Sequence, residues 1–173
     1  MMPGANWGAT ASERTVVLPC DALRPPASVQ ADRAVSIDAA PSIVFAWLCQ
    51  LRAAPYSYDI LDNLGRRSPR QRDPGLVHLE VGLRFMTLFA LQSFVDDEQI
   101  TLRAKGVVVT YMVRPTGAGA RLHARVWFAG PRLVARLLAL GDLVMMRKQL
   151  LTLKSLAERE GSSRGTASRR KSP

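Results

Sequence analysis

The chain has 173 residues, of which 47% are hydrophobic and 22% are charged. This length suits a single hydrophobic core, and the composition is too apolar for a disordered chain and too charged for a membrane bundle. Lysine and arginine outnumber aspartate and glutamate by 24 to 14, which favours contact with polyanions or anionic surfaces without naming one.

The cysteines and histidines are too few and too scattered for disulfide or metal chemistry. Cys20 and Cys49 form no Cys-x-x-Cys pair, and His78 lies far from His123 in the chain. We therefore expect reduced thiols, no metal site and no cofactor. The sequence also contains no Gly-x-Ser-x-Gly elbow and no phosphate loop, so it indicates no catalytic residues.

Composition divides the chain into three parts. Residues 1–32 are rich in alanine, proline and small polar residues, and they are predicted to form an extended N-terminal arm. Residues 33–160 carry the periodic patterns of a folded domain. Residues 161–173 combine serine, glycine and arginine without an acid, and they are predicted to be a disordered basic tail.

The sequence has no segment typical of secretion or membrane insertion. Residues 1–11 lack the basic and apolar regions of a secretory signal. The most apolar stretch, residues 133–146, contains Arg136 and Asp142 and is shorter than the roughly 20 residues that cross a bilayer. We therefore expect a cytoplasmic protein.

The first elements of the folded part are a strand and two short helices. Residues 33–38 alternate as a half-buried strand. Pro41 suits the first turn of a helix over residues 42–51, whose apolar side chains recur every three or four residues. A second short helix is expected at residues 59–64, where Gly65 would end it.

The hydrophobic period changes to two after the second helix, and it predicts strands at residues 76–81, 83–95, 99–105, 107–114 and 120–129. Their short connections favour antiparallel neighbours. In the last strand His123 shares one face with Arg121 and Arg125, opposite a row of apolar side chains. We therefore expect a solvated histidine there rather than a general base.

The last predicted helix opens at Pro131 and runs to about Glu160. At 100° per residue, its buried face is predicted to hold Val134, Leu138, Gly141, Met145, Thr152 and Leu156. More apolar side chains remain on this helix than one contact with a sheet requires. The excess suggests a partner or a covered edge.

Three stretches of sequence resemble a known superfamily. They are residues 33–48, residues 56–68 with the run Tyr-Ser-Tyr-Asp, and residues 142–150. Both these residues and the order of elements are similar to the START-like (SRPBCC) superfamily, also called the polyketide cyclase/dehydrase and lipid transport family. The resemblance spans about residues 33–158 and implies the helix-grip fold, an α+β architecture in which a curved antiparallel sheet wraps a long C-terminal helix.

The resemblance also implies a cavity between the concave face of the sheet and the terminal helix, with an apolar ligand inside. It implies no particular reaction, because fold alone does not choose one. The first hypothesis is binding or carriage of a small hydrophobic molecule, lipid-like or polyketide-like. A polyketide cyclase or dehydratase and a non-catalytic adaptor with a filled core both stay open, as does a homodimer.

Five residues are candidates for ligand contact: Tyr56, Tyr58, Tyr111, Leu138 and Met145. The first two tyrosines would lie at the mouth, where an aromatic ring and a hydroxyl can hold the polar end of a ligand; packing against the core explains them as well. Tyr111 is the buried hydroxyl expected from the sheet. Met145 and Leu138 are expected to face the sheet from the helix.

Arginines gather in one predicted loop, at Arg66, Arg67, Arg70 and Arg72. With the basic tail they could make weak contact with an anionic membrane, since each phosphate contact adds a salt-dependent attraction. Few aromatic residues interleave with them, which disfavours stacking on nucleic-acid bases. Plain solvation explains the cluster as well.

Overall fold

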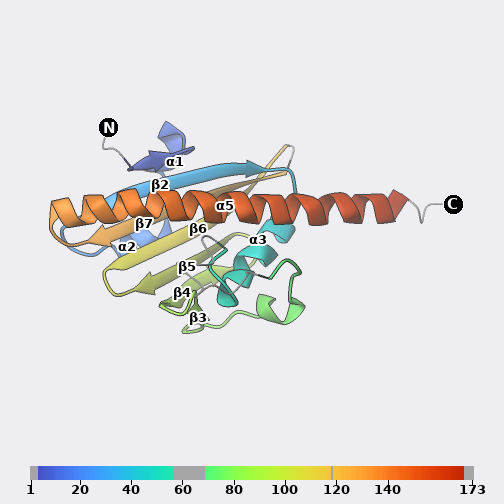
Figure 1. Cartoon of the computed structure of the whole chain (residues 1–173), viewed down its shortest axis with the longest axis horizontal. Helices are drawn as coiled ribbons and strands as arrows, with labels where there is room; N and C mark the ends of the chain where they lie inside the picture. Colours follow the sequence, from blue (N-terminus) through green and yellow to red (C-terminus); the bar gives the residue numbers. More distant parts are fainter. Residues whose placement is uncertain (1–3, 57–68, 118, 170–173) are drawn as a thin grey trace.

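The computed structural model describes residues 4–56, 69–117 and 119–169, with side chains up to Ser163. Its strands are β1 (Asn6–Trp7), β2 (Ser28–Ile37), β3 (Arg84–Phe85), β4 (Phe89–Val95), β5 (Gln99–Ala104), β6 (Val107–Thr116) and β7 (Gly119–Ala129). They form one sheet in the order β1, β2, β7, β6, β5, β4, β3. A long helix, α5 (Arg132–Arg169), lies across this curved sheet (Figure 1). The predicted helix-grip α+β fold is confirmed.

Strands β5, β6 and β7 form where they were predicted, and the segment before them differs. No strand forms at residues 76–81, where a 3-10 helix, η2 (Pro74–Val77), begins after Asp73. The carboxylate of Asp73 accepts a hydrogen bond from the backbone N–H of Gly75 at 2.8 Å, which stabilises that turn. The predicted strand at 83–95 divides into β3 and β4 at Met86 and Thr87, whose backbones are left-handed.

The first predicted helix is present as α3 (Pro41–Cys49), and it continues as the 3-10 helix η1 (Gln50–Arg52). Pro41 occupies its first turn, as expected. Every residue from Ile43 to Cys49 is buried, because α3 packs against both the sheet and α5. The helix predicted at residues 59–64 lies outside the described residues.

The N-terminal arm has more structure than predicted. It contains β1, α1 (Ala11–Thr15) and α2 (Pro19–Ala22), and β2 already begins at Ser28. Gly8 crosses β2 so closely that a Cβ there would lie 2.2 Å from the carbonyl oxygen of Ala34, and its φ of +74° also favours glycine. The arm is therefore part of the folded domain.

The arm covers the face of β6 and β7 that points away from α5. The prediction that this face is exposed to solvent is therefore wrong. His123 is only 2% exposed. Its Nε2 lies 2.9 Å from Oδ1 of Asp32, and Nε of Arg125 donates to the same oxygen at 2.9 Å. Burial alone would raise the pKa of Asp32, but hydrogen bonds from His123, Gln30 and Arg125 outweigh it and hold that pKa below its ordinary value.

The buried side of α5 differs in part from the predicted one: Leu156 is buried as expected, whereas Val134 and Leu138 are exposed. The side chains that pack on the sheet and α3 are Ala135, Ala139, Met146, Gln149, Leu150, Leu153, Leu156 and Ala157. Small alanines allow the helix to approach β2 closely, so the leucines beside them face outward. The helix also continues to Arg169, beyond the predicted end near Glu160. No helix in the described part of the chain is long and apolar enough to cross a membrane.

Candidate functional site

A cavity of about 350 Å³ lies between the concave face of the sheet and α5. Its described lining residues are Pro55, Met86, Leu88, Phe89, Val107, Val109, Tyr111, Val126, Phe128, Asp142, Met145, Met146 and Gln149. The sheet supplies the floor, α5 supplies the roof, and the segment around β3 and β4 closes one side. This volume is within the range of small-molecule sites, which is roughly 300 to 1,000 Å³.

The apolar floor follows from the register of two strands. Val109 of β6 pairs with Val126 of β7, and Val107 pairs with Phe128. Because side chains two residues apart share a face, all four reach the same side of the sheet. Three methionines, Met86, Met145 and Met146, also line the cavity, and their flexible thioethers adapt to ligands of irregular shape.

Two polar side chains meet across the cavity. The hydroxyl of Tyr111 on β6 donates to Oε1 of Gln149 on α5 at 2.7 Å, and Nε2 of Gln149 donates to the carbonyl of Pro55 at 2.6 Å. Burial, with a smaller effect from Asp142, raises the pKa of Tyr111 well above its ordinary value. The hydroxyl therefore stays protonated and remains a donor.

Asp142 places a carboxyl group in the wall of the cavity. One of its oxygens lies 3.3 Å from the guanidinium of Arg33, which is fully buried and also donates to the carbonyl of Ala139 at 3.0 Å. Burial raises the pKa of Asp142 to about 6, although Arg33 favours its charged form. This carboxyl group therefore gains or loses a proton close to neutral pH.

The structure brings two of the five candidate ligand-contact residues, Tyr111 and Met145, to the cavity. Tyr56 is buried in the core, with its ring edge-on to Trp47 at 6.1 Å between centroids, and Leu138 lies exposed on α5. Tyr58 lies outside the described residues. Asp142 and Gln149 were missed, although Asp142 interrupts the most apolar stretch of the sequence.

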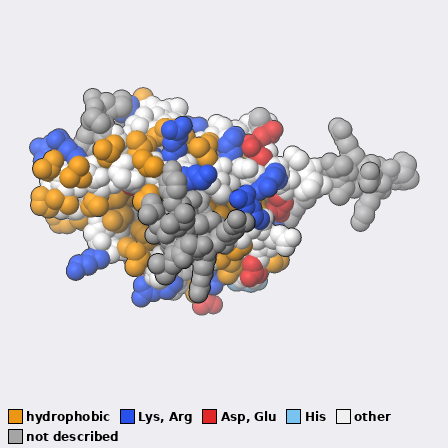
Figure 2. Space-filling view, viewed as in Figure 1, with side chains coloured by type: hydrophobic (Ala, Val, Ile, Leu, Met, Phe, Trp, Pro, Cys, Tyr) orange, Lys and Arg blue, Asp and Glu red, His pale blue; other side chains and the backbone are white. Residues whose placement is uncertain are grey.

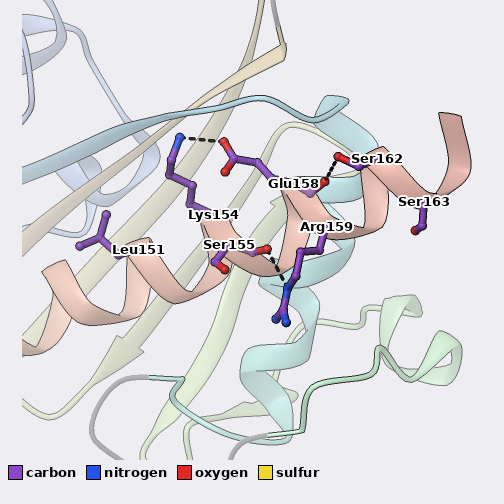
Figure 3. Close-up of a pocket in the computed structure, with 7 residues that line it drawn as sticks. All are labelled: Leu151, Lys154, Ser155, Glu158, Arg159, Ser162 and Ser163. Atoms are coloured by element: carbon purple, nitrogen blue, oxygen red, sulfur yellow. Dashed lines mark hydrogen bonds and ion pairs between the residues drawn. The ribbon is translucent and has the colours of Figure 1, made fainter. Parts of the chain in front are cut away.

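A larger and more open hollow, of about 660 Å³, lies along the C-terminal half of α5. Its described lining residues all come from that one helix (Figure 3). The polar groups there bond to each other: Nζ of Lys154 lies 2.7 Å from Glu158, and Arg159 donates to the carbonyl of Ser155 at 3.2 Å. No opposing apolar wall is present among these residues, so the cavity beneath α5 is the better candidate.

The predicted arginine cluster is only partly described. Arg72 forms an ion pair with Glu160 at 3.0 Å, and Arg70 is exposed, whereas Arg66 and Arg67 lie outside the described residues. Glu160 also accepts from the indole N–H of Trp47 at 3.0 Å. Within the described ranges, no group of three or more His, Cys, Asp or Glu side chains could hold a metal ion.

No protein-family model and no curated protein sequence matches the chain. Solved structures do match it, at low identity. Protein SSP2350 from Staphylococcus saprophyticus is 15% identical with a TM-score of 0.51, over 73% of this chain and 89% of that one. Protein NE0264 from Nitrosomonas europaea is 11% identical with a TM-score of 0.51, over 76% and 95%.

The di-domain ARO/CYC protein StfQ, from the steffimycin biosynthetic pathway, also matches. It is 12% identical with a TM-score of 0.51, and the match covers 82% of this chain and 54% of StfQ. At such identities the similarity establishes the fold alone. It agrees with the predicted helix-grip fold.

Proposed function

We propose that this protein binds a small hydrophobic molecule, lipid-like or polyketide-like, in the cavity between the sheet and α5. The observation that carries the proposal is the cavity itself, with its volume of about 350 Å³ and its mostly apolar lining. Small-molecule sites typically combine apolar walls with a few placed polar groups. An adaptor with a filled core would have no use for such a space.

The polar groups of the wall suggest what the ligand carries. Asp142 accepts hydrogen bonds when it is charged, and Arg33 already occupies one side of its carboxyl group. Tyr111 and Gln149 already form a hydrogen bond with each other, so neither requires a hydrogen bond from the ligand. A mainly apolar molecule with one hydroxyl or similar donor, directed at Asp142, fits this arrangement.

A cyclase or dehydratase is the second candidate, and Asp142 favours it. A carboxyl group whose pKa is about 6 can act as an acid or a base near neutral pH. The described lining residues include no histidine, cysteine or serine, so a reaction would depend on Asp142 and on the orientation of a reactive substrate. Asp142→Asn separates the two candidates, because an enzyme would lose the turnover that its wild type shows, whereas a carrier shows no turnover with either form.

Native mass spectrometry tests the binding proposal. The protein is incubated with a mixture of long-chain fatty alcohols and polycyclic aromatic ketones and then transferred to volatile buffer. We expect one adduct per chain. Val126→Phe, which fills the cavity from its floor, should remain folded and lose the adduct.

Val95→Phe is the matched control, because it adds the same ring on an exposed position of β4. It should retain the adduct. The proposal fails if the wild type carries no adduct from the mixture, or if Val126→Phe carries as much as the wild type.

A further inference from the structure

Helix α5 exposes a row of apolar side chains between residues 133 and 151. Its members are Leu133, Leu137, Leu140, Val144 and Leu151, which we call the outer face of α5. Leu133 is 69% exposed and Leu137 is 62% exposed. Figure 2 shows hydrophobic side chains gathered over this part of the helix.

Helical geometry places these five residues on one side. They follow each other by three, four or seven residues, and they lie opposite Ala135 and Ala139, which face the sheet. Single exposed leucines are ordinary on protein surfaces. From Leu133 to Val144 four such side chains follow each other at helical spacing, and an apolar surface of this kind marks an interaction site.

The charges around the outer face are positive. From Arg132 to Leu153 the exposed charged side chains are Arg132, Arg136, Arg147 and Lys148. The one acid in this stretch, Asp142, is half-buried and paired with Arg33. An apolar row bordered by cations and free of exposed acids is complementary to a surface of lipid tails beneath anionic headgroups.

We propose that the outer face of α5 docks on an anionic membrane surface. The leucines and Val144 enter the boundary between headgroups and acyl chains, and the basic side chains meet lipid phosphates and carboxylates. The outer face shares no residue with the arginines of the predicted loop or with the predicted basic tail.

The position of Lys148 disfavours a second copy of this chain as the occupant. It follows Val144 by one turn and lies between Val144 and Leu151 on the outer face. In a symmetric contact two such ammonium groups would be buried without an acid from this face, which is costly. At a membrane, Lys148 can lay its aliphatic stem on the apolar surface and extend its charge to the headgroups.

The docking surface adjoins the cavity. Met145 is 38% exposed on the flank of the outer face, and it also lines the cavity. Docking would therefore hold the cavity beside the bilayer, which suits exchange of an apolar ligand. This consequence rests on the proposed function, whereas docking itself does not require an occupied cavity.

Vesicle flotation tests the inference. The full chain is mixed with vesicles of phosphatidylcholine alone or with about one third phosphatidylserine, at low and high salt. We expect flotation with the anionic vesicles, loss of it in high salt, and little with phosphatidylcholine. The double variant Leu137→Glu/Val144→Glu should not float, and Lys148→Gln should weaken partitioning about fivefold.

Val17→Glu/Val81→Glu is the matched control, because it makes the same changes at two exposed valines outside α5. It should float as the wild type does, and all variants should melt normally. The proposal is overturned if the wild type does not float with anionic vesicles, or if the Leu137/Val144 variant still floats and truncation after Ser163 abolishes flotation. A wild-type dimer in sedimentation that Leu137→Glu/Val144→Glu dissociates would assign the face to a second copy instead.

Discussion

The hydroxyl of Tyr111 on β6 donates to Oε1 of Gln149 on α5 at 2.7 Å, across the cavity that separates the sheet from the helix. Both side chains are buried, and Gln149 also bonds the segment before residue 57 through the carbonyl of Pro55. This pair therefore ties the floor of the cavity to its roof without filling it.

Tyr111→Phe should destabilise the protein by about 1 to 3 kcal/mol, because it leaves a buried acceptor on Gln149 without its donor. Urea denaturation of Tyr111→Phe, Gln149→Leu and the double variant measures the coupling between the two residues. We expect a coupling energy of about 1 kcal/mol. Strictly additive effects would show that the pair does not stabilise the fold.

Asp142 should make stability fall as the pH rises toward neutrality. Its pKa in the folded protein, about 6, lies above its ordinary value of 3.8, because of burial that Arg33 only partly offsets. Protonation therefore favours the folded state, and this contribution is fully present below about pH 4 and lost as the pH rises through about 6. At about 1.4 kcal/mol per pKa unit, the loss amounts to roughly 2 to 3 kcal/mol.

The difference in unfolding free energy between wild type and Asp142→Asn isolates this effect. We expect the unfolding free energy of the wild type to fall relative to that of the variant as the pH is raised from about 4 to 7. Asp96→Asn, the same change on an exposed loop, should track the wild type at every pH. Parallel curves for wild type and Asp142→Asn would contradict the raised pKa.

The buried ion-pair cluster of Asp32 and Arg125, which the N-terminal arm covers, should be required for stability. Asp32→Asn removes one of the two acids that pair with Arg125, the other being Asp21, and breaking a buried ion pair costs about 3 to 5 kcal/mol. The exposed control Asp96→Asn should change stability by no more than about 0.5 kcal/mol. If Asp32→Asn unfolds at the same urea concentration as that control, the buried cluster does not stabilise the fold.

The sequence predicted the sheet from β5 to β7 because alternation there is local and strict. The prediction failed for the face of the sheet that the arm covers, because Asp21 and Asp32, the acids that pair with Arg125, lie far away along the chain. The sequence of this strand, with His123 between two arginines on one face, is typical of a solvent-exposed face. In the folded protein that face is covered by residues that lie far away along the chain. Only the tertiary structure supplies that cover.

The candidate site was predicted in part for a similar reason. Tyr111 was expected on the inner face of the sheet, and it lines the cavity. The predicted orientation of α5 was right for Leu156 and wrong for Leu138, because close approach to β2 buries Ala135 and Ala139 instead. That error placed Leu138 inward and overlooked Gln149.

The most direct test of ligand binding is a titration with N-phenyl-1-naphthylamine, an apolar probe that fluoresces when it leaves water. The wild type should bind it at one site, and Met145→Trp, which adds a large ring at the cavity wall, should melt like the wild type and lose that binding. Leu133→Trp, on the exposed side of the same helix, should bind as the wild type does. The account is contradicted if the wild type binds no probe and Met145→Trp is destabilised by about 1 kcal/mol or more, because strain of that size is typical of a packed core.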